Sequence, residues 1–135
     1  MRICLVTNLY DPYILGGAEI SVGHLAEQLA VEGHDILIIT TQPRTKADID
    51  TGSEGITVKR FYPMNLYSLM DSKSKPGFLK PLWHAIDMWN PHSYVVTKKI
   101  LQKFSPDIVN THNIFGLSSS VWSAVHSLRR TRKRS

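Results

Sequence analysis

The sequence predicts an α/β fold with a mainly parallel sheet. Strand-like and helix-like patterns alternate along the chain, which is the order of βαβ units. Residues 36–39 form an unbroken apolar run, as in a strand that helices cover on both faces. Gly16 and Gly17 stand between the first strand pattern and the first helix pattern, at a junction where α/β proteins bind phosphates. A turn that binds no ligand explains the glycine pair equally well.

The first half of the chain contains three predicted strands and one helix. Residues 2–7 form the first strand, and residues 35–40 form the second. Between them, a helix over 17–32 places its apolar side chains on one face, and Gly33 ends it in a left-handed conformation. The apolar face consists of Val22, Leu25, Ala26, Leu29 and Ala30. Residues 56–61 alternate in polarity, which places this third strand near an edge of the sheet.

The second half begins with an irregular segment, residues 62–90, in which prolines allow only a short helix over 82–89. Aromatic and lysine side chains alternate there. They line a ligand cleft, rest on a membrane surface or pack on their own domain, and the sequence leaves all three readings open.

Helix and strand patterns return at Asn90, which caps a helix that begins at Pro91 and ends near residue 104. A fourth strand covers 107–111. The last helix covers 118–128, and we expect three of its side chains to face inward. They are Val121, Trp122 and Val125.

Composition limits the classes of function. The 135 residues are 42% hydrophobic, enough for one packed domain. The single cysteine, Cys4, lies in an apolar strand, which excludes an internal disulfide and favours a buried thiol. No apolar run reaches the roughly 20 residues of a membrane span, and a cytoplasmic location is expected, with peripheral membrane contact as the alternative.

The net charge of +5 comes from the C-terminal end. Residues 129–135 carry five of the sixteen basic side chains, so residues 1–128 carry eleven basic and eleven acidic ones. We therefore predict no nucleic-acid partner, because such a face needs cations clustered on a folded element. The basic tail is expected to be solvated and disordered, or to contact anionic lipid or polyphosphate.

His112 follows the fourth strand as the glycine pair follows the first, and ligands of open α/β sheets collect at these carboxyl ends. A histidine there can accept a proton from a hydroxyl substrate, or it can be a hydrogen-bonded structural residue. The loop has no Gly-x-Gly-x-x-Gly, and Thr41 and Gln42 stand where a nicotinamide-binding domain needs an acid. No histidines have metal-ligand spacing, so no metal site is predicted.

Four motifs together resemble the N-terminal, acceptor-side domain of family 4 glycosyltransferases. They are residues 5–10 with Pro12, the Gly-Gly-Ala-Glu of 16–19, Leu29-Ala30 with Gly33-His34, and residues 106–113. The likeness covers residues 1–128. It implies a Rossmann-like three-layer domain, one half of the two-domain GT-B architecture, which transfers a sugar from a nucleotide-sugar donor to an acceptor hydroxyl with retention of configuration. It implies no cofactor and no metal.

The same resemblance assigns roles to individual residues. Gly16 and Gly17 would lie beside the donor's phosphates, and His112 would be the catalytic residue near the transferred sugar. Acceptor contacts would come from Glu19, Asn113 and Asn8, although Glu19 also fits an ordinary first-turn acid. Relatives often have histidine where this chain has Asn110.

The resemblance also implies a missing half. The family's second domain, with the paired glutamates that bind most of the donor, does not follow residue 128, where the likeness stops. A truncated domain of this kind would be inactive alone. The alternatives are a non-enzymatic fragment, a subunit completed by a separately encoded donor domain, and a nucleotide-binding module unrelated to sugar transfer.

Overall fold

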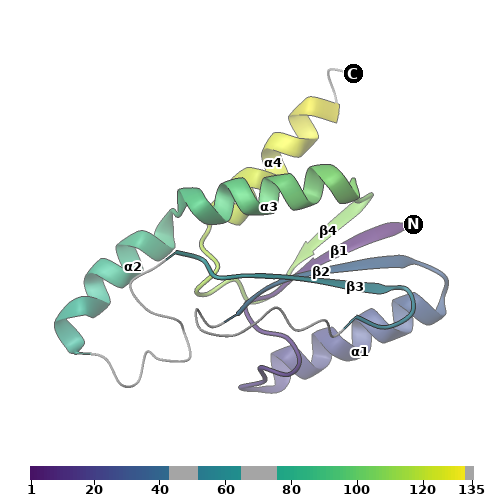
Figure 1. Cartoon of the computed structure of the whole chain (residues 1–135), viewed down its shortest axis with the longest axis horizontal. Coiled ribbons are helices and arrows are strands. Elements are labelled where there is room, and N and C mark those ends of the chain that lie inside the picture. Colours follow the sequence, from purple (N-terminus) through teal and green to yellow (C-terminus); the bar gives the residue numbers. More distant parts are fainter. Residues whose placement is uncertain (43–51, 65–75, 133–135) are drawn as a thin grey trace.

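The computed structural model describes residues 1–42, 52–64 and 76–132 (Figure 1). Its strands form one parallel sheet in the order β3-β2-β1-β4. The strands are β1 (Arg2–Val6), β2 (Asp35–Thr41), β3 (Ile56–Phe61) and β4 (Ile108–Thr111). The helices are α1 (Gly17–Val31), the short 3₁₀ helix η2 (Gly77–Leu79), α2 (Lys80–Met88), α3 (Pro91–Phe104) and α4 (Ser120–Arg132). The predicted α/β, Rossmann-like fold is confirmed.

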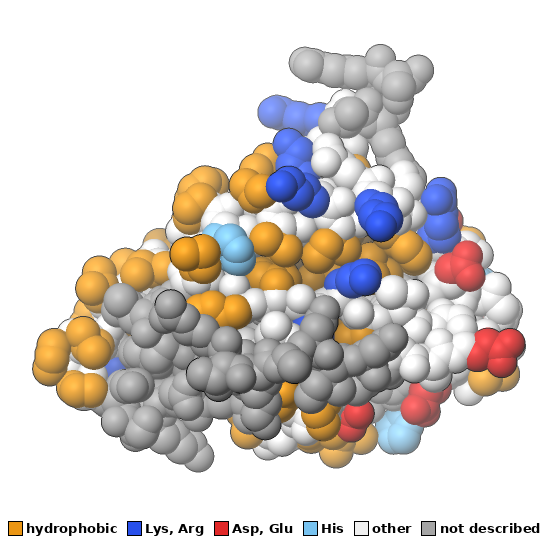
Figure 2. Space-filling model, viewed as in Figure 1, with side chains coloured by type: hydrophobic (Ala, Val, Ile, Leu, Met, Phe, Trp, Pro, Cys, Tyr) orange, Lys and Arg blue, Asp and Glu red, His pale blue; other side chains and the backbone are white. Residues whose placement is uncertain are grey.

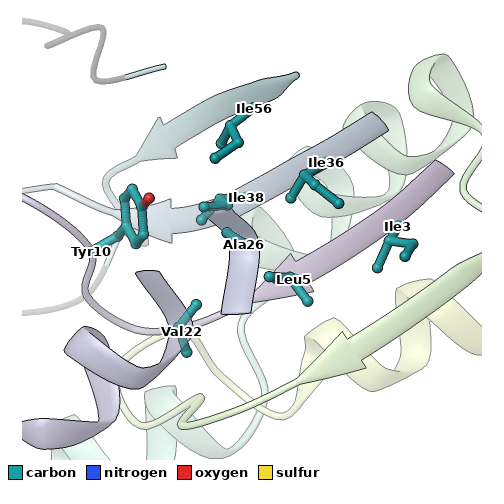
Figure 3. Close-up of a cluster of buried hydrophobic side chains, with 8 residues drawn as sticks. All are labelled: Ile3, Leu5, Tyr10, Val22, Ala26, Ile36, Ile38 and Ile56. Atoms are coloured by element: carbon teal, nitrogen blue, oxygen red, sulfur yellow. The ribbon is translucent and has the colours of Figure 1, made fainter. Parts of the chain in front are cut away.

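The sheet divides the hydrophobic core into two layers, because successive side chains of a strand point to opposite faces. Ile3 and Leu5 of β1 pack with α1 on one face. Cys4 and Val6 pack on the other face with α3 and α4. Figure 1 shows the two helical layers on either side of the sheet. Figure 3 shows the first cluster, in which β1, β2 and β3 contribute side chains toward α1. Its buried members are Ile3, Leu5, Tyr10, Val22, Ala26, Ile36, Ile38 and Ile56.

The predicted helix ends are confirmed by their cap geometry. Gly33 has φ of +82°, the left-handed conformation that ends α1. Asn90 begins α3, and its side chain accepts hydrogen bonds from the backbone N–H groups of His92 and Ser93. β3 lies at an edge of the sheet, as its alternating pattern predicted.

Two expectations for the C-terminal helix are wrong. α4 continues through Arg132, so residues 129–132 are helical and do not form a disordered tail. Trp122 does not face inward: 56% of its surface is exposed, whereas its neighbour Val121 is fully buried. Much of the irregular segment, residues 65–75, lies outside the described residues. Among the described helices, none combines the length and the apolar stretch that a bilayer crossing requires.

Burial of Cys4 predicts a loss of stability in alkali. Desolvation raises the pKa of its thiol from 9.0 to about 12. Above pH 9 the unfolded thiol loses its proton while the folded thiol keeps it. We therefore expect this group to lower the free energy of unfolding by about 1.4 kcal/mol per pH unit as the pH rises from 9 toward 12, with its full contribution present below pH 9.

Urea unfolding across this range, for the native chain and Cys4→Ala, measures the effect. The variant should lack that component of the alkaline slope, whatever its stability at neutral pH. Equal slopes for both proteins would contradict the prediction. Because other groups titrate in the same range, only the difference between the two slopes is compared.

Candidate functional site

The carboxyl ends of three strands meet at Asn8, the second residue after β1. Its backbone N–H donates to the carbonyl of Asn113 at 2.6 Å, in the loop after β4. Its carbonyl accepts from Thr41 at the end of β2, from the backbone N–H at 3.2 Å and from Oγ1 at 2.5 Å. One residue thus joins the loops in which the sequence predicted a ligand site.

His112 lies at this edge with part of its surface exposed. Its backbone N–H donates to the carbonyl of Val6 at 2.8 Å, which extends the pairing of β4 with β1. Its ring atom Nε2 is buried and has no hydrogen-bond partner among the described residues. A buried polar atom of this kind is uncommon and calls for a partner, which a bound hydroxyl would supply. The imidazole can donate or accept that bond, depending on its tautomer.

The predicted acceptor contacts Asn8 and Asn113 lie close together, but each side chain accepts a hydrogen bond from the backbone of its own loop. Asn8 is 3% exposed, and its Oδ1 accepts from the N–H of Leu9 at 2.9 Å. Asn113 is exposed, and its Oδ1 accepts from the N–H of Phe115 at 3.2 Å. Both amides therefore shape the edge of the site, and Asn113 is the one that solvent reaches.

Gly16 and Gly17 are exposed at the start of α1, but their environment is partly acidic. The N–H of Gly16 donates to Oε2 of Glu19 at 2.8 Å, and Glu19 is 6% exposed. Glu19 thus satisfies one free amide of the helix start and places a carboxylate there. A Cβ added to Gly17 would meet nothing within 4 Å, so the space beside this glycine is open. A phosphate has room at Gly17, whereas at Gly16 it must replace the Glu19 carboxylate.

Sequence reasoning missed Arg60, which holds the loop between β1 and α1. This β3 side chain is 8% exposed and lies over the rings of Tyr10 and Tyr13, 5.9 and 5.8 Å from their centroids. Its guanidinium donates to the carbonyl of Tyr10 at 3.4 Å and to that of Asp11. Burial raises the pKa of Tyr10, aided by Glu27 and Asp11, while Arg60 lowers it.

Asp87 joins α2 to the loop that follows His112. Its Oδ2 accepts from the N–H of Gly116 at 3.2 Å, and Oδ1 is buried without a hydrogen-bond partner in the described part of the chain. Desolvation raises the pKa of this carboxyl group, although the Gly116 N–H and His84 act in the opposite direction. Across the described ranges, no three His, Cys, Asp or Glu side chains gather as a metal-binding group.

Comparison with known proteins gives a match to one family model and to relatives that are longer than this chain. The family model of Glycosyltransferase Family 4 matches residues 15–134. An uncharacterized 42.6 kDa protein in the cps region of Klebsiella pneumoniae is 35% identical over 122 residues, which cover 90% of this chain and 32% of that protein. A glycogen synthase of Mycobacterium tuberculosis (strain CDC 1551 / Oshkosh) is 36% identical over 63 residues, 43% of this chain and 15% of the synthase. The chain spans about a third or less of the length of these curated relatives.

Proposed function

Because this chain belongs to glycosyltransferase family 4, we propose that it forms the acceptor-side domain of an enzyme that transfers a sugar, with retention of configuration, from a nucleotide sugar to a hydroxyl group. The observation that carries the proposal is the ring of His112, with its buried, unpartnered Nε2 at the edge where three strand ends meet. The length of the relatives supports a second, donor-binding domain outside these 135 residues.

In this proposal the chain's own groups act at two points. The bond between the anomeric carbon and the leaving phosphate oxygen breaks, so negative charge develops on the diphosphate beside Gly17. Amide groups at a helix start stabilise such charge, since they are fixed in place before the reaction. The acceptor oxygen forms the new bond to the anomeric carbon, and His112 orients its hydroxyl or accepts its proton.

Substitution of Gly17 tests whether the loop binds the donor. We expect weak binding of nucleotide sugars by the chain, and an affinity at least about tenfold lower for Gly17→Trp, because the indole fills the open space beside the loop. Gly17→Ala is the matched control and should bind normally, since its methyl group has no neighbour within 4 Å. Ligand-detected NMR with UDP-, GDP- and ADP-sugars suits weak binding.

Two results would redirect the proposal. Unchanged binding by Gly17→Trp would remove the glycine loop from the site. Saturable binding of free nucleotides without any preference for the sugar form would favour a nucleotide-binding module instead.

Turnover measurements test whether these 135 residues are sufficient for sugar transfer. The chain alone should release no sugar from these donors, because the second domain would bind most of the donor. Turnover at about 1 per second or faster, typical of enzymes, would refute the proposed inactivity. Co-purification with a separate donor-domain protein would identify the chain as one subunit of a split enzyme.

A further inference from the structure

The loop between β4 and α4, residues 112–119, is fixed in place at several points. Near its start, the carbonyl of Asn113 accepts a hydrogen bond from the loop after β1 at 2.6 Å. Further along, the N–H of Gly116 donates to Oδ2 of Asp87 in α2 at 3.2 Å. Ser118 has φ of +86°, a left-handed conformation that is uncommon for a residue with a side chain. Residues in such conformations concentrate at ligand sites, where the surrounding structure holds them.

Phe115 lies at the surface of this loop, whereas its apolar neighbours face the core. Ile114 and Leu117 pack in the hydrophobic cluster under α3 and α4, and Leu117 is fully buried. Phe115 belongs to neither core cluster, and 45% of its surface is exposed. Its ring is supported from α2, because the ring centroids of Trp83 and His84 lie 5.2 and 6.0 Å from its own. Since Trp83 is 3% exposed, Phe115 rests on a fixed base with part of its ring open to solvent.

Polar groups precede this ring in the same loop. His112 has a buried Nε2 without a hydrogen-bond partner among the described residues, and the side chain of Asn113 is exposed. A ligand that contacts both the open ring and these groups needs an apolar face beside hydroxyl groups. A sugar in its pyranose form has both, because its C–H groups make part of one side of the ring apolar while its hydroxyls point outward. The electron-rich face of an aromatic ring attracts such C–H groups.

A purely apolar ligand would find more contact area elsewhere. Figure 2 shows hydrophobic side chains at the end of the molecule that α2 occupies in Figure 1. Phe78, in the turn before α2, is 79% exposed, and Leu82 is 53% exposed. Phe115 differs from these side chains by its place in the loop of His112. Phe78 therefore serves as an exposed phenylalanine outside the candidate site.

We propose that Phe115 is the surface on which the acceptor stacks, and that the acceptor carries its hydroxyl on a pyranose ring. The inference rests on the proposed function, because it places the acceptor at the edge where His112 lies. One face of the sugar would lie on the phenyl ring, and a hydroxyl of the same sugar would reach Nε2 of His112. Phe115 would thus favour sugars over acyclic polyols, whose flexible chains have no preformed apolar face.

Binding of simple glycosides to the chain tests this stacking. The probes are the methyl pyranosides of glucose, galactose, mannose and N-acetylglucosamine, and sorbitol is the acyclic reference. Saturation-transfer NMR should detect at least one pyranoside, with the strongest saturation on the C–H groups of one ring face, and sorbitol should bind far more weakly. Phe115→Ala should weaken the binding at least about fivefold, because the ring is lost. Phe115→Tyr keeps the ring and should bind within about twofold of the native chain.

Phe78→Ala is the matched control, since it removes an exposed phenyl ring outside the loop of His112 and should leave binding unchanged. Four results would overturn the inference: no binding of any of the four pyranosides, equal binding of sorbitol, unchanged binding by Phe115→Ala, or equal losses in Phe115→Ala and Phe78→Ala. Circular dichroism confirms that each variant is folded.

Nucleotide-sugar binding by the native chain, measured in parallel, separates this inference from the proposed function. If nucleotide sugars bind and pyranosides do not, the stacking role of Phe115 is refuted and the proposed function stands. If neither binds, both are refuted. Pyranoside binding that depends on Phe115, without nucleotide-sugar binding, would support the stacking role and count against the donor loop.

Discussion

Replacing Arg60 by methionine is expected to lower the free energy of unfolding by about 3 kcal/mol, because hydrogen bonds and cation–π contacts are both lost at one buried position. The guanidinium donates to the carbonyls of Tyr10 and Asp11, and it lies over two tyrosine rings. Methionine is unbranched and can fill the space of the aliphatic part of the arginine side chain, but it is shorter and donates no hydrogen bonds. Urea unfolding monitored by circular dichroism measures the change.

The consequence of this substitution should extend to the loop before Gly16. Without Arg60, the segment from Tyr10 to Tyr13 loses its attachment to β3, so limited proteolysis should cut there sooner than in the native chain. Lys59→Met is the control, since it makes the same chemical change at an exposed neighbour on the same strand. A loss below about 1 kcal/mol for Arg60→Met would mean that water replaces the guanidinium at both carbonyls.

Replacing Asn90 by alanine should lower the free energy of unfolding by about 2 kcal/mol. The residue is 2% exposed, and its Oδ1 accepts from the N–H groups of His92 and Ser93 at 3.0 and 3.2 Å. Its Nδ2 donates to the carbonyl of Met64 at 3.1 Å. Alanine removes the helix cap and this link to the segment after β3 together.

Asn90→Asp separates the two contributions. Aspartate keeps the oxygen that caps α3 but cannot donate to Met64, so its stability should fall between those of the native chain and Asn90→Ala. Thermal and urea unfolding of the three proteins give the order. If the alanine variant matched the native chain in stability, neither contact would contribute.

The order and type of the regular elements could be predicted from sequence because local signals agree with the fold. Gly33 and Asn90 mark helix ends through their own conformational chemistry, independently of distant residues. The apolar run of β2 is likewise a local signal, and it indicates a strand that helices cover on both faces. Trp122 illustrates the limit of periodicity. Consecutive residues of an α-helix lie about 100° apart around its axis. Because the buried face of α4 is centred on Val121, the next residue, Trp122, lies toward solvent.

The candidate site could be predicted only in part. Topology brings His112 and Asn8 to one edge, since parallel strands end at the same side of a sheet. The capping role of Glu19 was available from its spacing to Gly16, which is that of a residue that bonds the helix start. The burial of Arg60 had no local signal. It depends on two tyrosines about fifty positions earlier in the sequence, and an alternating strand pattern does not indicate such a contact.

The position of β1 in the sheet has a consequence for synthesis on the ribosome. Ile3 pairs with Ile36, 33 positions later, and with Ile108, 105 positions later. Closing the longer loop costs about 1 kcal/mol more in chain entropy than closing the shorter one. β1 can pair with β2 once the first third of the chain has emerged, but its other side stays unpaired until β4 emerges. A strand that is internal in the sheet is therefore an open edge from the emergence of β2 until that of β4, when chaperones would have reason to bind it.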